Sequence, residues 1–251
     1  MLVIRESQLA AFADASQAGF ERRLRAGLAE PFPQCAARSN ETALAALVRL
    51  GIEKAAAHGL EAEAEVQSYL HLMLLLGSHW EQDPQSAWAA AMLADAAHGT
   101  AAQRVGALWE RAQAWRQRVM GEGDGQHLAA VRYVLGRSVE ELCKNPSRSQ
   151  RDLLIQFAAV HSRKFAEVGE QGLYDLTRLA VEACKRFDLA DRWAVVLMAQ
   201  FMFLFGAGFL GDPLYAWAHE ALTEAAGAGV DEKLERLLRA ARAHMSAQVA
   251  P

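Results

Sequence analysis

The chain has 251 residues, of which 52% are hydrophobic and 22% are charged, and its formal net charge is −4. This balance is typical of a globular protein with a buried core and excludes an intrinsically disordered chain. A net negative charge gives no general attraction to nucleic acid or to anionic membranes, so we expect neither as a partner.

The first part of the chain carries three predicted helices and then a signal for a fourth. Alanine, leucine, glutamate and arginine are abundant and favour helix. We predict helices over residues 5–28, 40–58 and 61–76. Gly77 ends the third of these, and Asp83 and Pro84 then read as an N-cap followed by proline at the first helical position. Trp88 follows one turn later, and we interpret it as a buried packing anchor.

The middle of the chain, residues 99–148, is predicted to be a helical connector. Thr100 is suited to cap a helix that runs to about Met120. The glycine-rich stretch 121–125 interrupts it and reads as an inter-helix loop, because it lacks the residues of a phosphate-binding or calcium-binding loop. A second connector helix is predicted from about Gln126 to Cys143.

The last part of the chain repeats the pattern of the first. We predict helices over residues 149–168, 171–187, 190–205 and 231–248. Another helix is predicted to begin at Pro213, with Asp212 as its N-cap and Trp217 one turn in, facing the core. The run from Ala194 to Leu210 has seventeen residues without a charge, which is the lower limit for crossing a bilayer. We interpret this run as a buried core helix and expect no membrane insertion.

An internal repeat supports this division. When the chain is shifted by 129 residues, Leu47–Leu93 aligns with Leu176–Leu222 without a gap and with fifteen identical pairs. The pattern Gly-(x)5-Asp-Pro-(x)3-Trp-Ala occurs in both copies at the same spacing, which composition alone does not explain. We therefore predict an all-α fold of about eleven helices, with two duplicated units joined by the helical connector. The predicted boundaries are 1–98, 99–148 and 149–251.

The sequence predicts no catalytic, cofactor-binding or metal-binding residue. Eight histidines are present, but none forms a His-Glu-x-x-His motif, and no Gly-x-Ser-x-Gly motif occurs. The three cysteines match neither a disulfide framework nor a zinc spacing. We expect reduced thiols at Cys35, Cys143 and Cys184. No secretory signal is visible at the first residues, so we expect a cytoplasmic protein.

Residues 3–93 carry a set of short motifs: Ile4–Leu9, Phe20–Leu24, Phe32-Pro33, Arg49–Glu53, Tyr69–Met73, Gly77, Asp83-Pro84 and Trp88. With these motifs the segment resembles a family of helical proteins encoded in bacterial type VI secretion clusters, beside spike-tip (PAAR-type) proteins and toxic effectors. The resemblance departs at His71, where the family carries an aspartate. It implies an adaptor or co-chaperone that helps to stabilise or load an effector before export.

We therefore expect a non-enzymatic adaptor or co-chaperone that binds an effector, an effector chaperone or a PAAR-type protein. Its partner-binding residues are predicted to be Trp109, Trp115 and Phe32. The two tryptophans lie six positions apart and cannot share one helix face, so either one is left for a partner or both fill the groove between the repeats. An alternative is a small apolar ligand in a pocket between the repeats, lined by Trp88, Trp217 and phenylalanines. An enzyme with a spatially assembled site is a third hypothesis.

Overall fold

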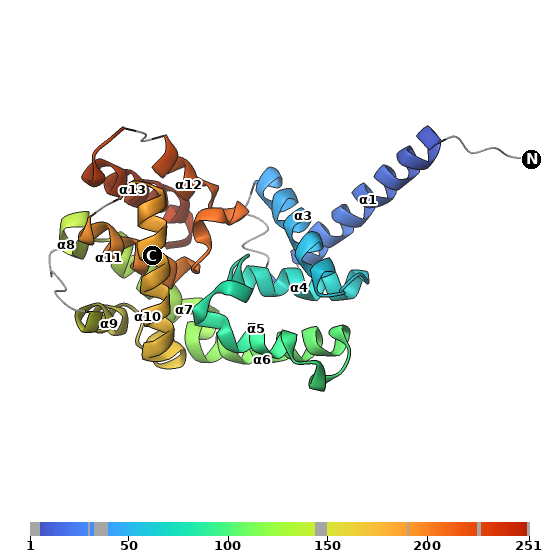
Figure 1. The fold of residues 1–251 in the computed structure, drawn as a ribbon, viewed down its shortest axis with the longest axis horizontal. Coiled ribbons are helices and arrows are strands. Elements are labelled where there is room, and N and C mark those ends of the chain that lie inside the picture. Colours follow the sequence, from blue (N-terminus) through green and yellow to red (C-terminus); the bar gives the residue numbers. More distant parts are fainter. Residues whose placement is uncertain are drawn as a thin grey trace, which may run out of the picture.

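The computed structural model describes residues 6–29, 31–32, 40–143, 150–189, 191–224 and 227–249. Within these ranges the chain forms twelve α-helices, six short 3-10 helices and no strand (Figure 1). The predicted all-α class is confirmed.

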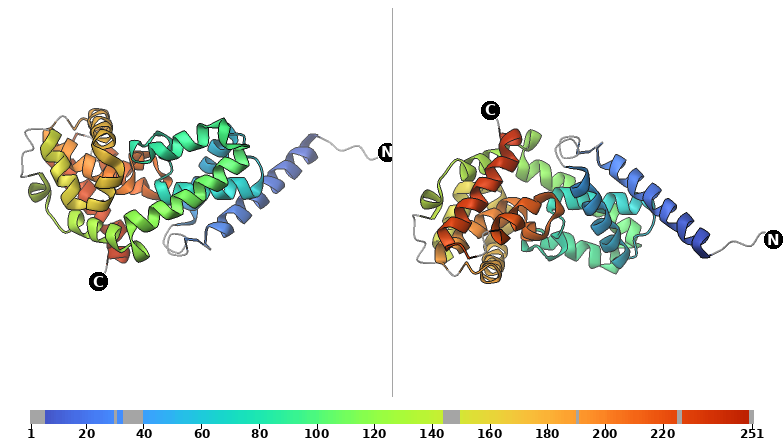
Figure 2. Two further views of the ribbon diagram at one scale, coloured as in Figure 1. Left: turned by 90° about the horizontal axis from the view of Figure 1, so that it is seen from below. Right: turned by 90° about the horizontal axis from the view of Figure 1, so that it is seen from above.

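The first unit begins with a long helix that is only partly packed. The C-terminal part of this helix, α1, lies on α3 and α4 through Leu24 and Leu28, whereas its N-terminal part extends away from the body (Figures 1 and 2). The Asn40 side chain caps α3 by accepting a hydrogen bond from Ala43 N at 2.7 Å. The helices of this unit are α1 (Glu6–Leu28), α3 (Glu41–Ala57), α4 (Glu63–Leu76), α5 (Ala87–Ala94) and α6 (Ala101–Met120).

The rest of the chain forms seven further helices: α7 (Gly125–Leu135), α8 (Val139–Cys143), α9 (Gln150–Val160), α10 (Ser162–Arg186), α11 (Arg192–Phe205), α12 (Ala216–Thr223) and α13 (Val230–Val249). Two predicted boundaries were wrong. The single helix predicted over 126–143 is two helices, because the chain leaves the helix at Gly136. The helix predicted over 149–168 ends at Val160, and His161 caps a new one. Gly169, with φ +73°, interrupts α10 between the helices predicted over 149–168 and 171–187.

Five elements of the first unit recur 129 residues later with the same bounds. Each begins and ends at the equivalent residue, and the glycines that end α4 and α11 have nearly the same backbone angles. The pairs are α4 with α11, η1 (Trp80–Gln82) with η5 (Phe209–Gly211), η2 (Pro84–Ser86) with η6 (Pro213–Tyr215), α5 with α12, and α6 with α13. Helix α6 is thus the equivalent of α13, and not an element present in one unit alone as we had expected. The origin of the units by duplication stays a prediction.

Two separate hydrophobic cores underlie the units. One is built from buried residues between Leu24 and Val119, and the other from buried residues between Ala130 and Met245. The predicted connector is therefore divided, with α6 in the first core and α7 and α8 in the second. Each unit also packs on a 3-10 turn of the other, since α3 contacts η6 and α10 contacts η2.

Helix α11 lies inside the second core, as predicted for this apolar run. Its residues from Val196 to Phe205 are all buried. It has only 14 residues. Among the described helices, none combines the length and the apolar character that a membrane span requires.

Candidate functional site

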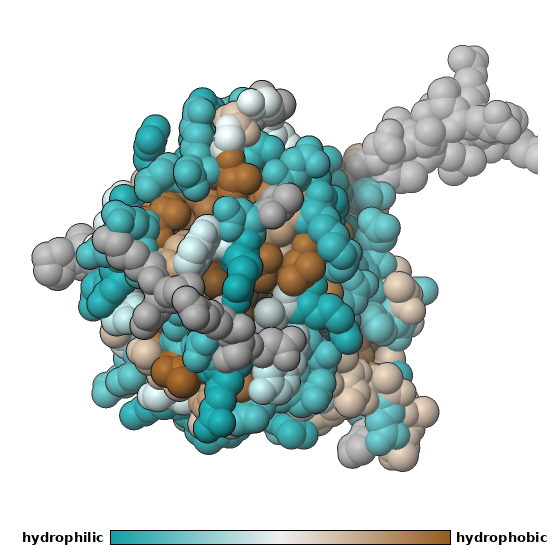
Figure 3. Space-filling view, turned by 60° about the vertical axis from the view of Figure 1, so that its left-hand side comes forward, coloured by the Kyte–Doolittle hydropathy of each residue, from teal (hydrophilic) through white to brown (hydrophobic). Residues whose placement is uncertain are grey.

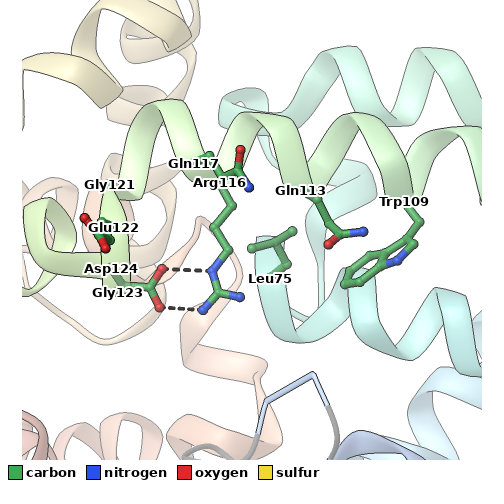
Figure 4. A pocket seen from close by; sticks show the side chains of 9 residues that line it. All are labelled: Leu75, Trp109, Gln113, Arg116, Gln117, Gly121, Glu122, Gly123 and Asp124. Carbon is green, nitrogen blue, oxygen red and sulfur yellow. Dashed lines mark hydrogen bonds and ion pairs between the residues drawn. The ribbon is translucent and has the colours of Figure 1, made fainter.

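An open hollow of about 580 Å³ lies beside α6 and the turn that follows it (Figure 4). Its size falls within the range of ligand-binding pockets, about 300–1,000 Å³. Helix α6 contributes four side chains, α4 contributes one, and the turn 121–124 forms one wall. The lining residues are Leu75, Trp109, Gln113, Arg116, Gln117, Gly121, Glu122, Gly123 and Asp124.

Helix α6 has one buried face and one face turned to the hollow. A capping box starts the helix, because the Thr100 hydroxyl accepts from Gln103 N while the Gln103 side chain accepts from Thr100 N. The buried face carries Val105, Leu108, Ala112, Trp115 and Val119. The hollow receives Trp109, Gln113, Arg116 and Gln117, which are spaced i, i+4, i+7 and i+8. Six helical positions place Trp109 and Trp115 about 120° apart, so the helix separates them.

The structure brings two of the three predicted partner-binding residues together. The ring centres of Phe32 and Trp109 are 6.2 Å apart in an edge-on arrangement, although 77 positions separate them in the sequence. Trp109 is half-buried and lines the hollow. Phe32 and Trp115, in contrast, are 9% and 3% exposed and belong to the core. Because a side chain packed in the core is not available to a partner, of the three predicted residues only Trp109 borders the hollow.

His71 completes the aromatic group and was not predicted to belong to the site. Its ring centre lies 5.2 Å from that of Trp109 and 6.1 Å from that of Phe32. Its Nε2 atom lies 3.2 Å from the Gly27 carbonyl oxygen and 2.8 Å from the Gln67 amide nitrogen. In the sequence, His71 was noted only as a departure from the family that the chain resembles.

Arg116 and Asp124 fix the wall of the hollow. The Arg116 guanidinium donates two hydrogen bonds to the Asp124 carboxylate, at 2.8 and 2.6 Å, and lies 5.3 Å from the Phe32 ring centre. The hydrogen bonds to Asp124 raise the pKa of Arg116. Asp124 has left-handed backbone angles, with φ +59°, which few non-glycine residues adopt. The glycine-rich stretch 121–125 therefore forms a defined turn, held by the ion pair.

A second cluster contains buried basic groups between α7, α9 and α10. Lys164 is 5% exposed, and its Nζ donates to the Phe203 carbonyl oxygen at the end of α11. Burial lowers the pKa of Lys164 to about 8, and burial together with the charge of Lys164 lowers the pKa of His127 to about 3 and of His161 to about 4. Such shifts occur at active sites and also in structural networks. Because Lys164 satisfies a helix-terminal carbonyl, its contacts are explained by packing.

A third cluster surrounds Glu81 in the first unit. The Glu81 carboxylate accepts from Lys54 Nζ at 2.6 Å and from the Tyr69 hydroxyl, and lies 3.3 Å from His58 Nε2. Although burial opposes it, the hydrogen bonds from Lys54 and Tyr69 hold the pKa of Glu81 below its usual value. The second unit has only apolar residues at the four equivalent positions: Ala183, Phe187, Met198 and Leu210. The equivalent part of the second unit is therefore built without this network.

The contact between the two units leaves no room for a ligand where their turns meet. The residues 76–79 and 205–209, with Asp83 and Asp212, enclose a space too small for a water molecule. Trp88 lies under Arg111 of α6 at 4.9 Å, and Trp217 lies 5.6 Å from His244 of α13. Both tryptophans are half-buried, not fully buried as we had expected, and each packs on a helix of its own unit.

The remaining features of the described residues give weaker evidence of a functional site. Within the described ranges, no group of three or more histidine, cysteine or acidic side chains is arranged to hold a metal ion. Cys143 and Cys184 are free and buried, whereas Cys35 lies outside the described residues. Figure 3 shows one face of the second unit. Among the residues coloured by hydropathy, hydrophilic residues lie between the hydrophobic ones.

No family model matches the chain, and no curated protein or solved structure is detectably similar to it. The resemblance to the type VI secretion proteins therefore rests on the quoted residues of the sequence alone.

Proposed function

We propose that the protein is a non-enzymatic cytoplasmic adaptor or co-chaperone that binds its partner through the hollow beside α6. The partner is an effector, an effector chaperone or a PAAR-type protein of a type VI secretion system. The family resemblance supports this class of partner, and the geometry of the hollow supports this location for the surface.

The observation that carries the proposal is the position of Trp109. Its indole is half-buried against Phe32 and His71 and borders an open hollow of about 580 Å³. Tryptophan is among the residues most enriched at binding hot spots, where a partner removes the remaining exposed part from water. The polar side chains around Trp109 provide the rim that usually surrounds such a residue.

The test is co-expression with each protein encoded beside the gene, followed by affinity capture and a measurement of the dissociation constant. Trp109→Ala is expected to weaken partner binding by about 30-fold or more, which corresponds to about 2 kcal/mol. Trp217→Ala is the matched control, because Trp217 is also half-buried but lies in the other unit. Retention of no secretion protein, or an equal loss in both variants, would contradict the proposal.

A further inference from the structure

The shape of the hollow restricts what can occupy it. It runs along α6 from Trp109 to the turn at Glu122, with Arg116 between them (Figure 4). The eleven steps from Trp109 to Met120 span about 16 Å at the rise of an α-helix. A helix bonds its backbone groups internally, whereas an extended segment leaves them free to pair with Gln113 and Gln117 of the hollow, which favours an extended segment over a helix.

One end of the hollow is apolar. Trp109 and Leu75 line it, and Phe32 and His71 support the indole from behind. An apolar or aromatic side chain placed here would bury surface against the indole ring.

The middle of the hollow is polar without being charged. Gln113 and Gln117 are one helical turn apart and exposed, and neither makes a hydrogen bond within the described residues. Each amide can donate and accept, so the pair can bond the backbone of an extended chain. These contacts would not depend on the sequence of the ligand.

The other end of the hollow is negatively charged. The positive charge of Arg116 is already paired with Asp124 through two hydrogen bonds. Glu122 is exposed and has no ion pair within the described part of the chain. Among the lining residues, the charge that is not paired is therefore that of the Glu122 carboxylate. A basic side chain of a ligand would complement it.

We infer that the hollow binds an extended segment of the partner protein that carries an apolar or aromatic residue and, four positions away, a lysine or arginine. This inference rests on the proposed function. An extended chain advances about 3.3 Å per residue, so residues four positions apart are about 13 Å apart, and their side chains cover the rest of the 16 Å from Trp109 to the turn. Residues four positions apart point to the same side of such a chain, so one reaches Trp109 while the other reaches Glu122.

The experiment is selection from a phage-displayed library of random nonapeptides on the wild-type protein, on Glu122→Lys and on Trp109→Ala. The wild type is expected to enrich an apolar residue and a lysine or arginine four positions apart. Glu122→Lys is expected to prefer aspartate or glutamate at the second position instead. With a selected peptide made synthetically, fluorescence anisotropy should show affinity about tenfold weaker for Glu122→Lys, and a peptide of reversed charge should restore it.

Glu110→Lys is the matched control, because Glu110 is exposed on α6 but does not line the hollow, and its selection should match that of the wild type. Peptides without a basic preference, or a preference unchanged by Glu122→Lys, would overturn the inference. If these peptides still bound the wild type but not Trp109→Ala, the proposed function would stand, and only the inference about the basic residue would fail. Enrichment of no peptide would overturn the inference, as would a wild-type dimer that Trp109→Ala makes monomeric, since the occupant would then be a second copy.

Discussion

Asp83 and Asp212 make the same hydrogen bond in opposite directions across the contact between the two units. The Asp83 carboxylate accepts from Ala207 N at 2.7 Å, and the Asp212 carboxylate accepts from Ser78 N at 3.0 Å. Ser78 and Ala207 are themselves equivalent at the 129-residue spacing. Each carboxylate also caps its own 3-10 turn, with a second bond of 2.9 Å. This aspartate contact between the two units is therefore made twice, once from each side.

Asp83→Ala and Asp212→Ala are each expected to lower the free energy of unfolding by about 2–4 kcal/mol. Each substitution removes a cap and also leaves a backbone N–H of the other unit without its acceptor, a buried one at Ser78 and a part-buried one at Ala207. Chemical denaturation followed by circular dichroism measures the effect. Asp191→Ala is the control, because Asp191 caps α11 by accepting from Trp193 N, and the loss of a cap costs about 1 kcal/mol. Equal losses in all three variants would contradict a role across the contact.

Trp115→Ala and Trp109→Ala are expected to separate stability from binding. Trp115 is 3% exposed in the core, so its truncation should lower the free energy of unfolding by about 3–5 kcal/mol. Trp109 is half-buried beside an open hollow, and its truncation should lower it by about 1–2 kcal/mol. Urea denaturation of both variants measures the difference, and a greater loss for Trp109→Ala would contradict the assignment of the two faces.

The network around Glu81 is expected to respond differently to partial and complete replacement. Glu81→Leu alone should destabilise the protein by about 2–4 kcal/mol, because it leaves Lys54 half-buried without its carboxylate. The quadruple variant Lys54→Ala, His58→Phe, Tyr69→Met and Glu81→Leu copies the second unit and should be close to the wild type in stability. Thermal unfolding compares the two variants. A quadruple variant less stable than Glu81→Leu would show that the first core needs the polar groups.

Acidification is expected to destabilise the protein partly through His161. Burial and the charge of Lys164 lower the pKa of His161 to about 4 in the folded state, against about 6.5 when unfolded. The unfolded chain therefore binds the proton first, and stability is lost as the pH falls from about 6.5 towards 4. Between pH 7 and 4.5 this group should account for about 2–3 kcal/mol of the loss.

His161→Asn should remove that part of the acid sensitivity while keeping an acceptor for Lys164 N, which the His161 ring now caps. Urea denaturation at the two pH values measures it for both proteins. His219→Asn, at an exposed histidine, is the control, and its stability should change with pH as that of the wild type does. An unchanged pH dependence in His161→Asn would contradict the assignment.

The sequence by itself determined the features that depend on neighbouring residues. Helix propensity and apolar spacing predicted the all-α class, and the Asp-Pro pairs predicted the caps at Asp83 and Asp212, because caps bond to residues only two or three positions away. The repeat could be recognised over Leu47–Leu93 because many of these residues are identical to those 129 positions later. It was missed for α6 and α13, where Leu108, Ala112 and Ala114 are the three residues that match at the 129-residue spacing.

Only the tertiary structure decided which distant residues meet. The contact of Phe32 with Trp109 depends on how α4 and α6 pack, since 77 positions separate the two rings. Helix geometry showed that Trp109 and Trp115 face apart, but not which of them is buried, because that depends on where α4 lies beside α6. The helix break at His161 was not predicted, because histidine is not among the residues that usually cap helices. Local patterns thus determined the elements, and packing over long separations decided the hollow.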